Sequence, residues 1–475
     1  MENSSSSEEA LHVVMFPYFA FGHISPFVQL SNRLCAHGVK VSFLSAPGNI
    51  SRIKSTLKLT PDAQIIPLQI PQVEGLPPGL ESTSDMTPAM AELLKQAIDL
   101  MQPHITTLLS QLKPHFVFFD FAQHWLPKLA SQLGIKTLRF SVFATISDAY
   151  IMVPARQHNS SSTSTSTTID DLMRPPNGFP VAHNIALKEF EARDFSYVFM
   201  RFHGNPSVYE RVLDCLNSCT AIVNKSCMEM EGPYVDFLRT QFQKPVLLTG
   251  PLVPEPPSGE LDHKWVHWLG QFPAKSVIYC SFGSETFLNQ DQIKELALGL
   301  ELTGLPFFLV LNFPANTNPQ TELARALPDG FMERIQNKGV VHTGWVQQQL
   351  ILAHQSVGCY VFHSGYSSVI EGLVSDCQLV LLPLKGDQYL NSKLVAGVED
   401  MRTGVEVKRR EESGGFGRED VMEAVKTVMV DVDKKPGVSI RANQSKWRQF
   451  LLNREIQDKF IADLVQALQG LKSLC

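Results

Sequence analysis

The fold is decided by residues 11–44, which read LHVVMFPYFAFGHISPFVQLSNRLCAHGVKVSFL. Leu11 to Phe16 is an uninterrupted apolar run, as expected of a parallel strand that is buried on both faces. Residues 25–37 carry apolar side chains at helical spacing, Gly38 ends that helix, and residues 39–44 form a second apolar run. Strand, helix and strand in this order predict a βαβ unit in a parallel sheet.

The same alternation continues along the rest of the chain. Further strands are predicted at 63–70, 116–119 and 136–140, with helical stretches such as 90–112 between them. A Ser/Thr run at 160–168 predicts a surface loop. Residues 250–257, GPLVPEPP, contain four prolines and are typical of an interdomain linker.

Beyond this linker the alternation restarts. Strands are predicted at 276–282, 307–311, 339–342, 358–362 and 378–382, and helices at 291–302 and 367–375. We therefore expect an α/β protein with two doubly wound domains that face a cleft. The boundaries are 1–250 for the first domain and 251–445 for the second, and a C-terminal helix at 446–475 is expected to pack back across the joint.

Composition excludes several classes of function. The 475 residues are 44% hydrophobic, and 41 Lys and Arg against 47 Asp and Glu give a formal charge of −6. A mildly acidic chain without a basic stripe is a poor candidate for binding nucleic acid or an anionic membrane. Residues 1–10 lack a signal-peptide pattern, and the eight scattered cysteines include no Cys-x-x-Cys pair, which indicates reduced thiols. We therefore expect a cytoplasmic protein. We also expect a monomer.

Phosphate binding has two candidate positions in the second half. The Gly-x-Gly-x-x-Gly fingerprint follows neither opening strand and no Walker A sequence occurs, which disfavours a nicotinamide dehydrogenase and a P-loop kinase. Gly283-Ser284 follows one predicted strand, and residues 363–368, HSGYSS, open a predicted helix. Free amides and hydroxyls at a helix N-terminus suit a diphosphate. The alternative is a simple helix cap by Ser367 or Ser368.

The whole stretch from Trp345 to Gln388 closely resembles the 44-residue signature box of plant family 1 UDP-sugar-dependent glycosyltransferases of secondary metabolism. The resemblance runs at full length without gaps, and extends to residues 22–26 (GHISP), 281–284 (SFGS) and the Pro-rich linker. It implies a GT-B fold, with the acceptor bound mainly by the first half and the UDP-sugar by the second.

The resemblance also implies roles for individual residues of the donor site. Trp345 would stack on uracil, the backbone of Val346 and the side chain of Gln348 would lie at base and ribose, and Glu371 would accept from the ribose hydroxyls. Ser284, His363 and Ser368 would contact the diphosphate, and Asp387 and Gln388 would contact the sugar. Gly365, Tyr366 and Ser367 would form the start of the helix at the donor site. The family usually has Cys, Trp and Asn where this chain has Ser364, Tyr366 and Ser367.

His23 and Asp120 are the candidate catalytic residues. In its Gly-His-x-x-Pro context, the resemblance assigns His23 the role of general base toward an acceptor hydroxyl; on its own it could be a loop residue between the first strand and the first helix. Asp120 follows the strand at 116–119 and emerges at the same sheet edge, where a carboxylate would stabilise the imidazolium; its alternative role is a helix N-cap. We expect inversion at the sugar carbon.

No cofactor or metal is expected. Glycosyltransferases of the other common fold hold a cation with an Asp-x-Asp pair, and Asp431-Val432-Asp433 matches those letters. This triplet follows a helical stretch far from the other candidates, and predicts a solvated turn.

Aromatic residues gather near the predicted strand ends of the first half and suit a flat or apolar acceptor. They include Phe16 and Tyr18, and the acceptor-binding candidates are Phe19, Phe21, Phe121, Trp125 and Phe143. Residues 16–24 and 375–380 are similar to a subgroup that extends the sugar of flavonoid or anthocyanin glycosides. A small-molecule glycoside, flavonoid or other phenolic or terpenoid, is thus favoured as acceptor, and UDP-glucose as donor, with UDP-rhamnose and UDP-xylose as alternatives.

Other functions stay open at this point. An aglycone O-glucosyltransferase would share every motif above. A nucleotide-sugar epimerase would not need the aromatic first-half surface, and a non-catalytic nucleotide-sugar-binding protein would not need His23 or Asp120.

Overall fold

The computed structural model describes residues 10–83, 86–159, 167–180, 185–314 and 317–473, so most of the Ser/Thr run at 160–168 lies outside the described residues. The chain forms two compact units. Unit 1 contains Met1–Ala155, Val198–Leu252 and Glu455–Cys475, and unit 2 contains Arg156–Tyr197 and Val253–Arg454. A single cut near residue 250 does not give this division, because residues 156–197 and 455–475 each belong to the unit built mainly from the other half.

Unit 1 is built on a seven-stranded sheet in which every paired strand is parallel. Its central strands are wholly buried apolar runs, as a sheet covered on both faces requires. In spatial order the strands are β3 (Ala63–Pro67), β2 (Lys40–Ser45), β1 (His12–Phe16), β4 (Phe116–Phe119), β5 (Lys136–Ser141), β6 (Ala221–Asn224) and β7 (Val246–Leu248).

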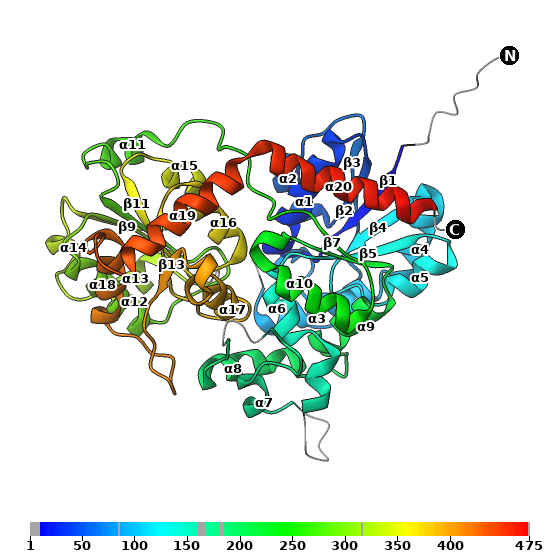
Figure 1. Cartoon of the computed structure of the whole chain (residues 1–475), viewed down its shortest axis with the longest axis horizontal. Coiled ribbons are helices and arrows are strands. Elements are labelled where there is room, and N and C mark those ends of the chain that lie inside the picture. The colour runs from blue at the N-terminus through cyan, green and yellow to red at the C-terminus, as the bar shows by residue number, and fades with distance from the viewer. Residues whose placement is uncertain (1–9, 84–85, 160–166, 181–184, 315–316, 474–475) are drawn as a thin grey trace. The chain divides into compact units, whose positions relative to one another are not determined.

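Helices cover this sheet, and the C-terminal helix is one of them. Ile461, Leu464 and Leu468 of α20 lie in the same buried cluster as Val13 and Phe27 (Figure 1, red helix). The helices of unit 1 are α1 (Phe21–Ala36), α2 (Ile50–Lys54), α3 (Pro88–Asp99), α4 (Gln102–Leu112), α5 (Leu126–Gln132), α6 (Thr145–Ile151), α9 (Val208–Ser218), α10 (Met228–Phe242) and α20 (Arg454–Ser473).

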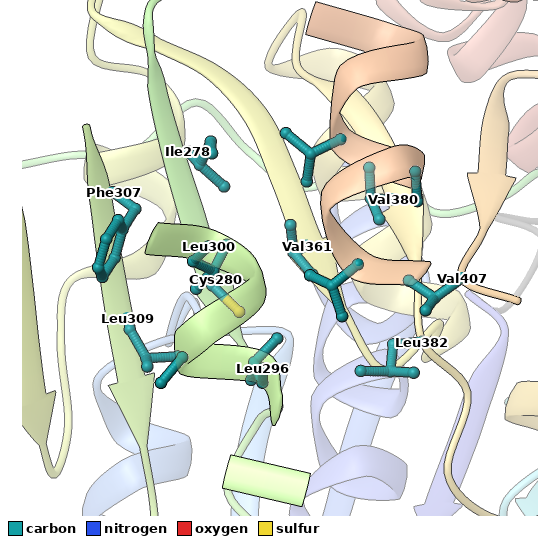
Figure 2. Packing of buried hydrophobic residues seen from close by; sticks show 14 of the residues in the cluster. Ile278, Cys280, Leu296, Leu300, Phe307, Leu309, Val361, Val380, Leu382 and Val407 are labelled. Carbon is teal, nitrogen blue, oxygen red and sulfur yellow. The ribbon is translucent and has the colours of Figure 1, made fainter. Parts of the chain in front are cut away.

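Unit 2 repeats this design with a six-stranded parallel sheet. Ile278, Cys280 and Val361 of its central strands pack against Leu296 and Leu300 of α12 (Figure 2). In spatial order the strands are β10 (Gly339–Thr343), β9 (Phe307–Leu311), β8 (Val277–Ser281), β11 (Val357–Phe362), β12 (Gln378–Leu381) and β13 (Gly404–Glu406).

The helices of unit 2 are α7 (Ile169–Met173), α8 (Glu189–Phe195), α11 (His263–Leu269), α12 (Gln290–Leu302), α13 (Pro319–Ala326), α14 (Phe331–Arg334), α15 (Gln348–Leu352), α16 (Tyr366–Val374), α17 (Gln388–Ser392), α18 (Arg418–Met429) and α19 (Gly437–Leu452). The first two of these, α7 and α8, come from the first half of the chain.

Two predicted helical stretches are each divided in two. Residues 90–112 form α3 and α4, and Pro103 lies in the first turn of α4, where its missing N–H costs no helical hydrogen bond. The C-terminal stretch forms α19 in unit 2 and α20 in unit 1. Among the described residues, no helix is both long and apolar enough to cross a bilayer.

Candidate active site

The first candidate site lies where the strand order of the first sheet reverses. β1 and β4 are neighbours there, and Phe16 pairs in register with Phe119 at their carboxyl ends. His23 lies in the first turn of α1, which follows β1, and Asp120 directly follows β4. The Nδ1 atom of His23 lies 2.7 Å from Oδ2 of Asp120. Open parallel sheets bind ligands outside this edge, so the pair stands where a substrate is expected.

Asp120 is held in place by the backbone around it. Its Oδ1 accepts from the N–H of Phe121 at 2.7 Å, and its Oδ2 accepts from the N–H of Tyr18 at 3.3 Å. Burial raises the pKa of Asp120, but His23 and the Phe121 amide lower it more, so the pKa lies below its usual value. An ionised carboxylate at Nδ1 of His23 favours the tautomer that carries its proton there, which leaves the lone pair on Nε2.

Three aromatic rings surround the His23 imidazole. The ring centroids of Tyr18, Phe121 and Phe143 lie 5.6, 5.5 and 5.3 Å from that of His23. Phe121 and Phe143 are predicted acceptor residues, and the structure brings both next to the candidate base. Tyr18 is a further neighbour that the predicted acceptor set lacks. Its position two residues after β1, at the same sheet edge, is the signal that could have found it.

The other three predicted acceptor residues pack elsewhere. Phe19 and Trp125 are buried and place their rings 6.3 and 6.5 Å from the ring of Phe16. The guanidinium carbon of Arg52 lies 3.3 Å from the centroid of the Phe21 ring. The structure does not group these three rings at His23.

Two expectations about this edge are wrong. α1 begins at Phe21 rather than near residue 25, so His23 is a helical residue and not a loop residue. Ser25-Pro26 imitates a helix start, since Pro favours the first helical position, but here Pro26 lies inside the helix. Asp120 is no helix cap either, because α5 begins at Leu126 with Trp125 at its N-cap position.

The second candidate site lies where the strand order of the second sheet reverses, between β8 and β11. His363 directly follows β11, and its ring lies between two glycines. A Cβ on Gly283 would lie 3.2 Å from Cε1 of His363, and one on Gly365 would lie 2.8 Å from its Nε2. Burial, and then the charge of Lys385, lower the pKa of His363 to about 4. His363 is therefore neutral near pH 7.

The helix that follows, α16, starts without a side-chain cap. Its N-cap residue is Gly365, so the alternative of a cap by Ser367 or Ser368 is wrong, and both hydroxyls lie in the first helical turn beside Tyr366. The amides of an uncapped first turn suit an anion. Ser364, just before, has a φ of 66° in the left-handed region, and its carbonyl accepts from Nδ2 of Asn391 at 3.0 Å.

A third group of predicted donor residues gathers between β10 and α16. Trp345 follows β10 and its side chain is 82% exposed, so one aromatic face is open to a base. Glu371 on α16 accepts from Nε2 of Gln348 at 2.8 Å and from Nε2 of Gln349 at 3.2 Å. The carbonyl of Val346 accepts from the N–H of Gln348 at 2.8 Å. An oriented carboxylate beside an exposed indole suits a nucleoside.

The turn formed by residues 385–388, which we call the 385–388 turn, contains the predicted sugar-binding residues. Oε1 of Gln388 accepts from the N–H groups of Leu384 and Lys385 at 3.0 and 3.1 Å, and its Nε2 donates to Oγ1 of Thr286 at 3.5 Å. Oδ2 of Asp387 accepts from Nδ2 of Asn391 at 2.8 Å. Asn391 orients both this carboxylate and the Ser364 carbonyl, and its place four residues after Asp387 is the helical spacing that could have found it.

The remaining diphosphate candidate lies after β8. Ser284 is exposed, and the carbonyl of the preceding Gly283 accepts from Nδ2 of Asn312 at 2.8 Å. By contrast, Asp431-Val432-Asp433 forms a turn after α18 in which Asp431 is paired with Lys434 at 2.7 Å. Within the described residues, no group of three or more His, Cys, Asp or Glu side chains could hold a metal ion.

Comparison with known proteins assigns the chain to a family. A family model described as "UDP-glucoronosyl and UDP-glucosyl transferase" matches residues 195–440. An anthocyanidin-3-O-glucoside rhamnosyltransferase from Petunia hybrida is 60% identical over 99% of both chains. The chain belongs to the UDP-glycosyltransferase family. It is an enzyme of that class, and the resemblance of residues 345–388 to the family's signature box is confirmed.

Other relatives agree. UDP-glycosyltransferase 79A6 from Glycine max is 58% identical over 98% of both chains. A cyanidin 3-O-galactoside 2''-O-xylosyltransferase from Actinidia chinensis var. chinensis is 42% identical over 97% of this chain and 98% of its own.

Solved structures confirm the predicted GT-B fold of this UDP-glycosyltransferase. Arabidopsis thaliana UGT89C1 complexed with UDP-L-rhamnose is 22% identical, with a TM-score of 0.71 over 97% of this chain and 99% of its own. Glycyrrhiza uralensis UGT73P12 complexed with glycyrrhetinic acid 3-O-monoglucuronide is also 22% identical, with a TM-score of 0.75 over 98% of this chain and 96% of its own.

Proposed function

We propose that this UDP-glycosyltransferase moves a sugar from a UDP-sugar to a hydroxyl on the sugar of a flavonoid-type glycoside, with inversion at the transferred carbon. The observation that carries the proposal is the contact of 2.7 Å between His23 Nδ1 and Asp120 Oδ2 at the reversal point of the first sheet. A histidine paired with a buried carboxylate and ringed by aromatic side chains is suited to take a proton from a hydroxyl of an apolar acceptor.

The proposed step is a direct displacement. His23 Nε2 takes the proton of the acceptor hydroxyl as its oxygen bonds to the anomeric carbon of the sugar. The bond between that carbon and the phosphate oxygen breaks, and UDP leaves with the electron pair. Asp120 stabilises the imidazolium that forms, and no covalent bond between sugar and enzyme is required.

The proposed donor site divides UDP between three groups of unit 2. The exposed face of Trp345 stacks on uracil, and Glu371, oriented by Gln348, accepts from the ribose hydroxyls. His363 donates as a neutral imidazole to the diphosphate, assisted by Ser284, Ser368 and the amides of α16. Stacking of a base on an aromatic ring contributes about 1–3 kcal/mol, so Trp345→Ala should weaken UDP binding at least several-fold.

The acceptor is proposed from the rings at His23 and from the relatives. Tyr18 and Phe121 are buried beside His23 and Phe143 is partly exposed, so Phe143 offers most of the apolar surface that these rings present to a flat ring system. The acceptors in the names of the Petunia and Actinidia enzymes are themselves glycosides. These two observations favour a glycoside over a bare aglycone, the second candidate.

We assign the donor sugar from the relatives more than from the geometry of the site. The hydrogen bonds of Gln388 to Leu384, Lys385 and Thr286 fix its side chain without indicating which hexose it would contact. The 60% identical relative is a rhamnosyltransferase and the 42% identical one a xylosyltransferase. We therefore place UDP-rhamnose ahead of the UDP-glucose that the sequence analysis favours, and UDP-xylose third.

A matrix of donors and acceptors tests these assignments. UDP-rhamnose, UDP-glucose and UDP-xylose are each offered with an anthocyanidin and with its 3-O-glucoside, and the linkage of every product is determined by NMR. We expect transfer to the sugar of the glucoside. Exclusive use of the aglycone would contradict the acceptor assignment, and turnover of UDP-sugar without acceptor would indicate an epimerase.

Three further parts of the proposal have separate tests. In this proposal transfer needs no metal, because His363, Ser284 and the α16 amides supply hydrogen-bond donors to the diphosphate in place of a cation. Loss of activity with EDTA and its recovery with Mn²⁺ would contradict that. We also propose that the protein is a monomer, which light scattering would test. We propose that it lies in the cytoplasm, which a fluorescent fusion would test.

A further inference from the structure

Helix α8 comes from the first half of the chain but packs within unit 2. Phe190 and Phe195 of α8 place their rings 5.8 and 6.3 Å from the ring of Tyr389, which follows the 385–388 turn. Phe190 also lies 5.2 Å from the guanidinium carbon of Arg409. A Cβ on Gly414 would come within 2.5 Å of the Phe190 ring, so this contact is tightly packed.

A buried ion pair fixes the same helix from a second direction. Glu191 of α8 lies 2.8 Å from Nζ of Lys393, and the two side chains are only 1% and 14% exposed. The same Glu191 oxygen, Oε2, also accepts from the N–H of Lys188 at 2.8 Å and closes the start of the helix. Because aromatic packing and a buried pair both hold α8, its C-terminal residues have a defined position.

Asp194 extends from this helix to the 385–388 turn. Its Oδ2 accepts from the N–H of Gly386 at 2.7 Å. Gly386 has a φ of 54°, in the left-handed region, and immediately precedes Asp387 and Gln388. Burial raises the pKa of Asp194, whereas the Gly386 amide and Lys385 lower it, with burial the larger effect.

The 385–388 turn is also tied down at its other end. Nζ of Lys385 donates to the carbonyl of Glu285 at 2.6 Å, in the segment after β8 that contains Ser284. The hydroxyl of Tyr389 donates to the carbonyl of Leu384 at 2.6 Å. Asp194 is therefore the contact by which α8 reaches the backbone directly before the predicted sugar-binding residues.

We propose that Asp194 is a positioning residue for donor-sugar recognition: by accepting from Gly386 it holds the 385–388 turn so that Asp387 and Gln388 face the sugar of the UDP-sugar. This inference rests on the donor site proposed above. It assigns Asp194 no contact with the substrate. Trp345, Glu371 and His363, the proposed contacts of uracil, ribose and diphosphate, lie outside this turn, although the charge of Lys385 acts on His363.

Binding measurements without acceptor separate this role from a general structural one. UDP, UDP-rhamnose and UDP-glucose are titrated calorimetrically into wild-type enzyme, Asp194→Ala, Asp194→Asn and Glu189→Ala. Asp194→Ala removes one hydrogen bond, so the UDP-sugar Kd should rise about 3–10-fold while the UDP Kd stays within about 2-fold. Asp194→Asn keeps an accepting oxygen and should restore UDP-sugar binding.

Glu189→Ala is the matched control, because Glu189 lies on the same helix and pairs with Arg193 on its exposed side. It should leave every Kd unchanged. An equal loss of UDP and UDP-sugar binding in Asp194→Ala, an unchanged UDP-sugar Kd, or no rescue by Asn would overturn the inference. A wild-type enzyme that binds no UDP-sugar would instead overturn the proposed donor site.

Discussion

Two histidines lie at the reversal points of the two sheets, His23 after β1 and His363 after β11, the strand that pairs with β8, and their surroundings differ. His23 follows the first strand of unit 1 and contacts the carboxylate of Asp120 at 2.7 Å. His363 follows the fourth strand of the second sheet's spatial order and lies between Gly283 and Gly365, with the positive Lys385 as its charged neighbour.

This difference assigns the two imidazoles opposite tasks. A carboxylate stabilises an imidazolium, so His23 is suited to accept a proton. Burial and a nearby ammonium group oppose protonation, so His363 stays neutral and is suited to donate a hydrogen bond to an anion that is already charged. The strand ends at the two reversal points are thus suited to a base in one sheet and to an anion ligand in the other.

The largest effect should come from removing the proposed base. His23→Ala should lower kcat/KM by about 10³-fold or more, because general base catalysis contributes about 10²–10⁴-fold. The UDP Kd from calorimetry should not change. His124→Ala is the control, since His124 also lies near carboxylates of unit 1, 3.7 Å from Asp99 and 3.4 Å from Asp214. Undiminished turnover in His23→Ala would remove this residue from the mechanism.

Removing the negative charge of Asp120, the partner of His23, should lower activity less than removing His23. Asp120→Asn still offers an oxygen to the amides of Phe121 and Tyr18, but it no longer stabilises the imidazolium. We expect kcat to fall about 10²-fold, with an unchanged UDP Kd. Thermal unfolding of the variant should be followed in parallel, because Asp120 is buried. A loss of activity that matches a loss of folded protein would contradict a catalytic role.

The sequence predicted the fold well where the signal is local. Apolar runs between helix and turn signals located the central strands, such as β4 and β9, almost to the residue. The strands β6, β7 and β13, which have only three or four residues, were missed, since so short a run has no clear periodicity. Pro26 misplaced the start of α1, because a proline usually marks a first helical turn.

The candidate site could be predicted to the extent that chemistry follows strand ends. His23 and Asp120 follow neighbouring strands, so their meeting is a consequence of topology. The contact between Asp194 and Gly386 spans 192 positions and joins two turns of ordinary composition. Nothing local in either segment indicates it, and only the tertiary packing of α8 brings it about.

A change at the second histidine should affect donor binding rather than the chemical step. His363→Ala should raise the UDP Kd about 10-fold, as expected for a lost hydrogen bond to a charged group. Because the pKa of His363 is about 4, the ring is neutral throughout pH 5.5–8. The ratio of variant to wild-type Kd should therefore be constant over this range. A ratio that rises as the pH falls would show that a protonated ring binds the diphosphate.

The smallest effect comes from one methyl group placed beside each histidine. Gly365→Ala puts a Cβ within 2.8 Å of His363 Nε2, so the ring must shift, and the UDP Kd should rise by roughly 2–5-fold, a cost of about 0.5–1 kcal/mol. Gly22→Ala lies one residue before His23, inside α1, and beyond its chain neighbours and the adjacent helix backbone no described atom lies within 4 Å of its added Cβ. It should leave the UDP Kd unchanged and stabilise the helix by about 0.5–1 kcal/mol, measurable as a higher Tm. Equal effects of the two substitutions on UDP binding would mean that the glycines do not set the position of His363, and that the contrast between the two histidines rests on charge alone.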